Sequence, residues 1–328
     1  MNTSGRNGGH AELVREIAES ASSAAQSALA ASWRRSLLYH RLDPEAQDLP
    51  DRETDITVRR ARERLGTLAA MAAPVIERVL NAVGRAGCCV LLTDANGLIV
   101  DRRGMACDDK IFAERGLWTG AVWSEAKEGT NGIGTCLAEQ RPVAILRDQH
   151  FRTRNTAMSC VGSPIFDEHA ELAGVLDVSS CRDEMMSDFA PLIATVIADA
   201  AREIESQAFR AAFPDCRIIM APAHGYRGAA LLAVDHYDLV LGATRLARQS
   251  LDLPDGFLPL PVSDVLAHGR QASDLRAAEC AELQRALARA SGNVSAAARE
   301  LGIGRATFYR RMRRAGLSNE FDLSPGRG

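Results

Sequence analysis

Arginines are concentrated near the C-terminus of this 328-residue chain. The thirty residues from Arg285 to Arg314 hold eight arginines against one acidic residue, Glu300, which leaves +7, although the whole chain carries −3. A guanidinium group can bind the edge of guanine through two hydrogen bonds in the major groove, and other arginines can bind phosphate. This uneven charge is typical of a basic, nucleic-acid-binding module attached to a near-neutral body.

The elements that must position these arginines follow from apolar spacing and from turn residues. We expect three helices, over residues 274–290, 294–301 and 305–315. Asn293 is a good N-cap for the second helix, and Gly302 allows a sharp turn before the third. Phe308 and Met312 lie four residues apart in the third helix and are expected to face inward. The pattern predicts a helix-turn-helix.

The third helix presents its remaining polar side chains outward or on its flanks. They are Arg305, Thr307, Tyr309, Arg310, Arg311, Arg313 and Arg314. Ser295 and the amides at the helix start near Asn293 are further candidates for phosphate contacts, because helix N-termini attract anions. The predicted partner is double-stranded DNA. Two alternatives stay open, namely a solvated basic surface helix and an architectural protein that bends DNA with little sequence preference.

Residues 293–312 resemble the Fis-type helix-turn-helix that ends bacterial enhancer-binding activators. By motif position, the resemblance implies DNA contacts at Arg305, Thr307, Tyr309, Arg310 and Arg311. It also implies a homodimer whose half-sites lie about 34 Å apart, one helical turn of DNA. The predicted DNA-contacting set is therefore Asn293, Ser295, Arg305, Thr307, Tyr309, Arg310, Arg311 and Arg314.

The preceding chain is predicted to be an α+β body built on a mostly antiparallel sheet. Strands are expected at residues 88–93, 98–100, 142–146, 159–166 and 172–178, followed by a closing helix over 184–209. Asn96-Gly97 predicts a two-residue hairpin loop, because this pair adopts the positive φ values that such a loop needs. Helices are expected over 11–39 and 55–83, the second kinked or broken at Pro74, after a disordered lead over 1–10.

A smaller unit is predicted between the sheet domain and the helix-turn-helix. It has a strand at 229–235, a partner strand at 239–242, a short helix at 243–251 and a proline-rich linker. It resembles the start of a PAS domain but is too short for a complete one, so we interpret it as degenerate. The predicted domains are a helical leader (1–84), a sensor domain (85–210), the PAS-like unit with its linker (211–265) and the helix-turn-helix (270–320).

Four segments of the N-terminal half resemble acetoin-type (AcoR-like) regulators. They are the leader Ala31-Ser-Trp-Arg-Arg-Ser-Leu-Leu-Tyr-His-Arg-Leu-Asp-Pro44, the stretch Trp123-Ser-Glu-Ala-Lys-Glu-Gly-Thr-Asn-Gly-Ile-Gly-Thr135, Arg141-Pro-Val, and Gly174-Val-Leu-Asp-Val-Ser-Ser180. The last three resemble the GAF domain of that family. The resemblance implies a small-molecule pocket between the sheet and its helical loops, and thus an unidentified small-molecule effector.

Candidate effector-binding residues are taken from the bulky and polar side chains near these motifs. They are Trp118, Trp123, Thr130, Asn131, Phe151, Met158 and Cys160. The alternative for the apolar members is ordinary core packing. The glycine-rich run that starts at Glu128 lacks the Gly-Lys-Ser/Thr ending of a phosphate-binding P-loop, so it is interpreted as a helix start that lines the pocket.

The eight cysteines show no CxxC pair and no metal-ligand spacing with histidine. We therefore predict reduced thiols in a cytoplasmic protein. We expect no metal, no cofactor and no catalytic residues. His150 and Cys160 are candidates to gate the pocket or to ligate a metal, but no clustered set of ligands accompanies them. Two alternatives use Cys107, Cys136 and Cys160: a redox-sensing regulator, and an enzyme that reduces methionine sulfoxide, as some GAF proteins do. No signal peptide is visible, and no apolar run approaches the roughly 18 residues of a membrane span.

One departure from the enhancer-binding activators is an absence. Their AAA+ ATPase lies between sensor and DNA-binding module, and nothing here matches its nucleotide-binding motifs or the loop that engages the sigma factor. The roughly seventy residues between Phe209 and Asp274 are too few for such a domain. The sequence therefore predicts a non-enzymatic regulator that acts on DNA occupancy, with RNA polymerase or a full-length activator as candidate partners.

Overall fold

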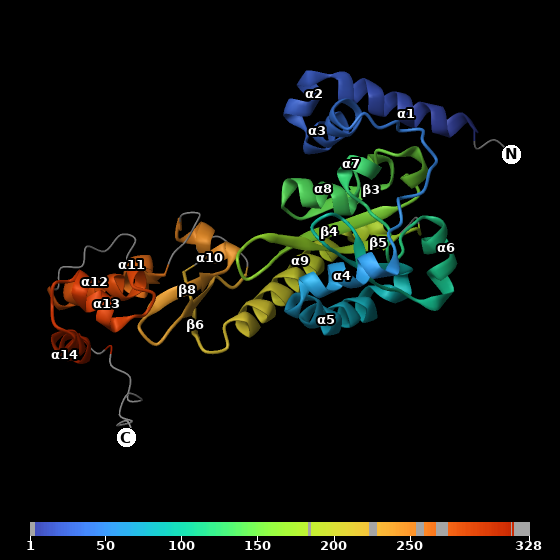
Figure 1. Cartoon of the computed structure of the whole chain (residues 1–328). Coiled ribbons are helices and arrows are strands. Elements are labelled where there is room, and N and C mark those ends of the chain that lie inside the picture. The colour runs from blue at the N-terminus through green and yellow to red at the C-terminus, as the bar shows by residue number, and fades with distance from the viewer. Residues whose placement is uncertain are drawn as a thin grey trace. The chain divides into compact units, whose positions relative to one another are not determined.

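The computed structural model describes residues 4–182, 185–222, 228–253, 259–266, 275–315 and 317 (Figure 1). The chain divides into two compact units, one made of Met1–Asp167 and Glu171–Ala208, the other of Glu168–Ala170 and Phe209–Gly328. Both contain antiparallel sheet and helices, which confirms the predicted α+β class. Among the described residues, no helix is both long and apolar enough to cross a bilayer.

Unit 1 is built on a five-stranded antiparallel sheet in the order β2-β1-β5-β4-β3. Its strands are β1 (Cys88–Thr93), β2 (Ile99–Arg103), β3 (Val143–Leu146), β4 (Ser159–Phe166) and β5 (Leu172–Ser180). All of β1 and β4 is buried, because both faces of the sheet are covered. This explains why these strands read as apolar runs instead of alternating patterns.

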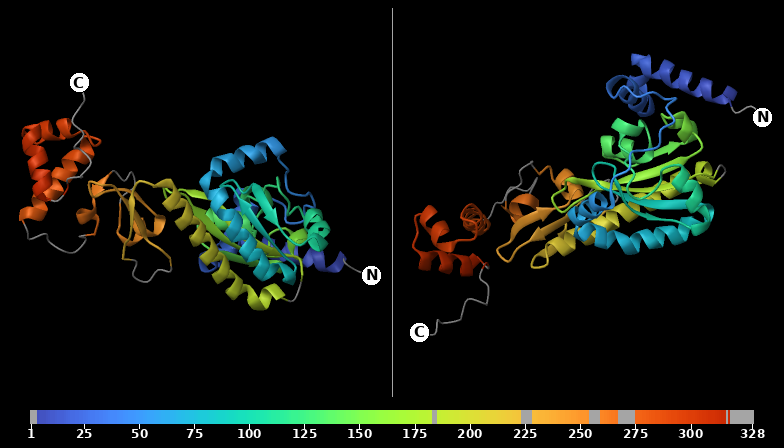
Figure 2. Two further views of the ribbon diagram at one scale, coloured as in Figure 1. Left: turned by 90° about the horizontal axis from the view of Figure 1, so that it is seen from below. Right: turned by 45° about the vertical axis from the view of Figure 1, so that its right-hand side comes forward.

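Three helices cover one face of this sheet (Figure 2). They are α4 (Asp55–Leu65), α5 (Thr67–Val83) and α9 (Met185–Ala212). Val90 and Val178 from the sheet pack in one core with Ile76 of α5 and Ile197 of α9. Of the kink or break expected at Pro74, the break was wrong, because α5 continues through this proline; the chain instead breaks at Gly66, whose φ is +51°.

Short elements cover the other face of the sheet. They are a 3-10 turn (Ala106–Asp108), α6 (Asp109–Glu114), α7 (Glu125–Glu128), α8 (Gly132–Glu139) and 3-10 turns at Arg147–Gln149 and Thr153–Asn155. Leu91 and Ile99 of the sheet pack there against Phe112, Trp123 and Met158. The loop-rich face holds the side chains considered below for effector binding.

The leader is a series of short helices. They are α1 (Ser4–Glu19), α2 (Ala21–Gln26), α3 (Ala28–Arg34) and a π-helix (Arg35–Tyr39). The single helix expected over 11–39 was wrong because Ser20 and Ser27 act as N-caps that start new helices. The disordered lead was also wrong for residues 4–10, which belong to α1.

The β1–β2 hairpin is wider than the predicted two-residue loop. Of Asn96 and Gly97, only Gly97 has a positive φ, at +81°. The Asp94 side chain holds the loop by accepting hydrogen bonds from the amides of Asn96 (2.9 Å) and Leu98 (3.0 Å). A register shift follows between Leu92 and Thr93, as expected where a bulge replaces a tight turn.

Unit 2 contains a four-stranded antiparallel sheet in the order β6-β7-β8-β9. The strands are β6 (Arg217–Met220), β7 (Leu231–Val234), β8 (Leu239–Ala243) and β9 (Leu260–Pro261). The helices are α10 (Arg245–Ser250), α11 (Val262–Leu266), α12 (Leu275–Arg289), α13 (Val294–Glu300) and α14 (Arg305–Ala315). The predicted proline-rich linker is part strand at β9, while its residues 254–258 lie outside the described residues.

Candidate functional site

The predicted helix-turn-helix is formed by α12, α13 and α14. Asn293 caps α13, where its Oδ1 accepts from the amide of Ala296 at 3.1 Å. Gly302 has φ +65°, a left-handed conformation that glycine adopts without a Cβ penalty, and it turns the chain between α13 and α14. The sequence thus places two short helices on one longer helix at the expected positions.

A compact core fixes these three helices against one another. Its buried members are Leu283, Ala286 and Leu287 of α12, Ala297 and Ala298 of α13, and Phe308 and Met312 of α14, together with Leu239 and Leu317. Phe308 is fully buried and Met312 is 3% exposed, which confirms the predicted inward pair. The small alanines of α13 allow the neighbouring helices to approach closely.

The predicted DNA-contacting side chains lie on α14 and at the start of α13. Arg305, Arg310, Arg311, Arg314 and Asn293 are exposed, whereas Ser295, Thr307 and Tyr309 are half-buried. The guanidinium of Arg305 lies 5.6 Å from the centre of the Tyr309 ring, so these two side chains stack at one end of α14. The helix therefore offers a basic outer surface opposite its apolar core, and DNA contact by these residues stays a prediction.

Three of the arginines counted in the sequence form ion pairs within unit 2. Arg289 forms ion pairs with Glu300 and with Glu282, and Arg285 pairs with Asp264 at 2.8 Å. Arg311 lies 3.6 Å from Glu279. Asp264, Glu279 and Glu282 lie outside residues 285–314, so the net charge of +7 counted for that segment overstates the positive charge available to DNA. The exposed arginines of this segment lie chiefly on α14.

The proposed effector residues occupy different parts of unit 1. Trp123 and Met158 lie in the loop-side core with Leu91. Phe151 is buried in a separate cluster with Trp33 of the leader. Trp118 is half-buried, with the Arg102 guanidinium 4.3 Å from its ring centre. The structure therefore does not bring these four side chains together at one cavity.

The polar pair Thr130 and Asn131 is used within the fold. Asn131 Oδ1 caps α8 by accepting from the amides of Ile133 (3.0 Å) and Gly134 (2.8 Å). A Cβ at Gly132 would lie 2.5 Å from Cys160 Cβ, so only glycine lets the start of α8 lie directly on β4. The glycine-rich run is thus a close helix-to-sheet contact.

Cys160 belongs to a buried polar chain on the loop-side face of the sheet. Ser179 Oγ lies 2.6 Å from Asp177 Oδ2 and 3.1 Å from Cys160 Sγ, which is 3.5 Å from His150 Nε2. Burial lowers the pKa of His150 to about 4 and raises the pKa of Asp177 to about 7. These side chains are therefore neutral at mildly acidic pH.

The two buried candidate redox thiols are in environments that oppose reactivity. Burial raises the pKa of Cys136 and of Cys160 well above its ordinary value, and the thiolate is the reactive form. Cys107 is exposed, while Cys136 packs with Val143 and Val175, apart from Cys160. Within the described residues, no group of three or more His, Cys, Asp or Glu side chains is arranged to hold a metal.

Asp177 makes the stability of unit 1 depend on pH. Its pKa is higher in the folded chain than the ordinary 3.8, so between about pH 4 and pH 7 the unfolded chain binds fewer protons and the free energy of unfolding falls as pH rises. Asp177→Asn removes this titration. At pH 8 the variant is expected to be more stable than the wild type, by up to about 4 kcal/mol, and the gain should vanish toward pH 4.

Chemical unfolding of both chains across pH 4–8 measures this difference. Asp148→Asn, at an exposed carboxylate, is the control and should run parallel to the wild type. Parallel curves for Asp177→Asn as well would show that Asp177 is ionised in the folded chain.

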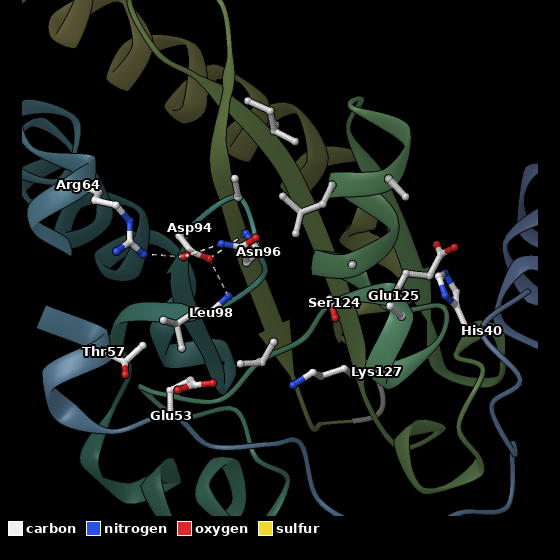
Figure 3. Close-up of a pocket in the computed structure, with 17 residues that line it drawn as sticks. His40, Glu53, Thr57, Arg64, Asp94, Asn96, Leu98, Ser124, Glu125 and Lys127 are labelled. Carbon is white, nitrogen blue, oxygen red and sulfur yellow. Dashed lines mark hydrogen bonds and ion pairs between the residues drawn. The ribbon is translucent and has the colours of Figure 1, made fainter. Parts of the chain in front are cut away.

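A pocket of about 660 Å³ lies elsewhere in unit 1, between the β1–β2 hairpin, α4 and the α7–α8 segment (Figure 3). Its apolar lining includes Leu98, Val122, Leu137 and Leu172. Arg64, Asp94 and Asn96 lie at one end in Figure 3, and Glu125 lies with His40 at the other. None of the seven predicted effector residues lines this pocket.

Four of the charged side chains that line the pocket are already paired. Asp94 lies 3.8 Å from Arg64, Lys127 pairs with Asp51 at 2.6 Å, and Glu125 pairs with Arg35 at 2.7 Å. An ionic occupant would have to compete with these internal pairs. The lining therefore suits a neutral molecule with both apolar and polar groups.

The leader is attached to the α7–α8 segment by buried polar contacts. Ser32 is fully buried, and its Oγ contacts Glu125 Oε2 (2.9 Å), Thr130 Oγ1 (2.7 Å) and Thr135 Oγ1 (3.3 Å). Arg35 donates to both oxygens of Glu125, at 2.7 and 3.1 Å. The leader motif and the 123–135 motif, considered separately in the sequence, thus form one polar cluster that reaches the pocket through Glu125. In the sequence, the signal for this cluster is the presence of Ser32 and Arg35 in an otherwise largely apolar leader helix.

Two protein-family models match this chain. The family model described as MimR, N-terminal domain matches residues 11–206, and the model described as bacterial regulatory protein, Fis family, matches residues 274–314. The acetoin catabolism regulatory protein of Cupriavidus necator is 32% identical over 229 residues, covering 67% of this chain and 34% of that protein. The propane 2-monooxygenase operon transcriptional activator MimR of Mycolicibacterium smegmatis is 31% identical over 183 residues, covering 54% of this chain and 28% of that protein.

A solved structure has a similar fold over much of the chain. The crystal structure of the E. coli DhaR(N)-DhaL complex aligns with a TM-score of 0.51 and 15% identity, over 69% of this chain and 76% of that one. At this identity the likeness concerns the fold alone. The chain spans about a third of the length of the curated relatives it matches.

Proposed function

We propose that this chain, which belongs to the MimR N-terminal domain family and carries a Fis-family helix-turn-helix, is a transcription regulator controlled by a small molecule. In this proposal it binds specific DNA sites as a homodimer. Family membership gives the general function, that of a transcription regulator with a sensory N-terminal domain and a DNA-binding helix-turn-helix. The dimer, the effector and the mode of action are the proposal.

One observation carries the DNA-binding part. Helix α14 buries Phe308 and Met312 in the module core and leaves Arg310, Arg313 and Arg314 exposed. A helix held rigidly from behind, with arginines in front, suits insertion into the major groove. A homodimer would present two such helices, for half-sites about 34 Å apart.

We place the effector in the 660 Å³ pocket of unit 1 instead of at the seven residues first considered. The names of the two relatives above refer to acetoin catabolism and propane 2-monooxygenase, and a third relative, 25% identical over 171 residues, is the glycerol metabolism operon regulatory protein of Citrobacter freundii. The proposed effector is therefore a small, neutral, oxygenated molecule. The apolar floor and internally paired charges of the pocket support this class.

Filling the pocket tests this assignment. Ala138→Trp, at a pocket-lining position, is expected to abolish the effect of acetoin or glycerol on DNA retention by the full chain, because the indole would occupy the space. Ala113→Trp, at an exposed position of α6 that does not line the pocket, should leave the response intact. A wild-type chain that responds to neither compound, or an Ala138→Trp variant that responds normally, would contradict the assignment.

We further propose that the chain does not hydrolyse ATP. In the segment between the sensor and α12, the described residues form the small sheet of unit 2 and short helices. The chain would then act by occupying DNA, in repression, in competition with a full-length activator, or through direct contact with RNA polymerase. Purified protein that turns over ATP would contradict this part of the proposal.

A further inference from the structure

The small sheet of unit 2 and the helix-turn-helix share one hydrophobic core. Leu239, the first residue of β8, is 3% exposed and packs in the same cluster as Leu283 and Leu287 of α12 and Phe308 of α14. Tyr237, in the turn before β8, packs against that cluster as well. A side chain of the sheet is therefore part of the core that positions the arginine-bearing helix.

A buried polar contact fixes the same junction. Gln284 of α12 is 2% exposed, and its Nε2 donates to the main-chain carbonyl of Tyr237 at 3.0 Å. At the flank, Arg285 of α12 pairs with Asp264 of α11 at 2.8 Å. The ion pair is partly exposed and contributes little to the stability of the junction. The Gln284 amide is buried, so losing its hydrogen bond to the Tyr237 carbonyl would leave a polar group unsatisfied and destabilise the junction.

The turn that receives α12 is itself well ordered by hydrogen bonds. Asp235 Oδ1 accepts from the amides of Tyr237 (2.8 Å) and Leu239 (2.9 Å), and the amide of Asp235 donates to the Leu239 carbonyl at 2.9 Å. Such a turn is preorganised, so docking α12 on it requires little further ordering.

The helix-turn-helix is a small module, and part of its core comes from the preceding sheet. Its family match covers only residues 274–314, and chains of about 40 residues seldom fold alone without a disulfide, a metal or a partner. Leu239 and the Tyr237 carbonyl supply a partner from within the chain.

We propose that the small sheet is the structural half of the DNA-binding unit, and that the Asp235–Leu239 turn is the docking surface that holds α12 and, through the shared core, positions α14. Close packing transmits a displacement of α12 to Phe308 and Met312, because the core has no slack to absorb it. On this account the sheet supports DNA binding and is not a second sensor, in contrast to a PAS domain that receives a signal.

Hydrogen exchange on the full chain tests the shared core. Leu239→Ala is expected to speed amide exchange in α12, α13 and α14 by about tenfold or more, and to weaken retention on a generic DNA duplex at low salt. Leu241→Ala is the matched control, since it changes the same residue type two positions along β8, where the side chain is 41% exposed. Leu239→Val gives a graded change if the alanine variant unfolds.

The reverse perturbation completes the test. Leu287→Ala, a fully buried position of α12, should speed exchange of the Asp235 and Leu239 amides in the turn. Exchange that increases only in the sheet with Leu239→Ala and Leu239→Val, or a turn that is unaffected by Leu287→Ala, would show two independent modules and overturn the proposal.

Discussion

Replacing Arg310 by alanine is expected to weaken binding to a specific DNA site by about 5- to 150-fold while the chain stays folded, because one bidentate arginine contact to a base is worth about 1–3 kcal/mol. Arg310 is exposed on α14, on the side away from Phe308 and Met312. Within the described part of the chain, its side chain forms no ion pair or hydrogen bond. It is therefore available to a ligand and contributes little to the fold.

Fluorescence anisotropy with a labelled duplex at fixed salt measures this loss. Arg59→Ala, an exposed arginine of α4 in unit 1, removes the same charge far from α14 in sequence and should bind DNA like the wild type. If Arg310 reads a base, the variant also loses discrimination at one position of the site; if it contacts phosphate, binding falls uniformly and the salt dependence is shallower. Unchanged affinity would remove Arg310 from the DNA-contacting set.

Replacing Glu125 by alanine is expected to destabilise unit 1 by about 2–3 kcal/mol and to release the leader from α7 and α8. The Glu125 side chain is 4% exposed, and it accepts both hydrogen bonds from Arg35 and one from Ser32. Removing the carboxylate takes the hydrogen-bond acceptor from the half-buried guanidinium of Arg35 and one acceptor from the buried hydroxyl of Ser32. The Arg35 side chain is 37% exposed, which lowers the cost below that of a fully buried pair.

Hydrogen exchange of residues 28–40, together with chemical unfolding, measures both effects. Glu114→Ala is the control, because that carboxylate is 63% exposed and lies 3.9 Å from Lys110. Since Glu125 and His40 both line the pocket, the released leader should also weaken the response to a small molecule. A variant with wild-type stability and wild-type leader protection would show that the contact to Arg35 adds nothing to the fold.

The predictable parts of the fold are those with a strong local pattern. Strands β4 and β5 follow from apolar, β-branched runs on either side of a polar turn, and α14 follows from its inward pair. The missed strand β6 offers only Arg217-Ile-Ile-Met220 as a signal. The leader was expected to be one helix because its alanine-rich composition favours helix throughout. It is instead divided, because Ser20 and Ser27 cap the starts of α2 and α3.

The site shows the same contrast between local and long-range information. Outward placement of Arg310 follows from helical periodicity alone, whereas the pairing of Arg285 and Arg289 depends on Asp264 and Glu282 from outside the basic segment. The pocket is assembled from the leader, α4, the hairpin and α8, which are far apart in sequence. Trp123, a candidate effector residue from the sequence, packs in the loop-side core, which is the alternative that the sequence left open for it.

Recovery of bound fragments from the organism's own genome tests the central claim most directly. The full chain is incubated with sheared genomic DNA at physiological salt, with and without acetoin, and the retained fragments are sequenced. The account predicts a small set of sites that share a two-fold symmetric motif, whose occupancy changes with the small molecule and disappears with Arg310→Ala. Fragments without a common motif, retained equally by the wild type and by Arg310→Ala, would contradict it.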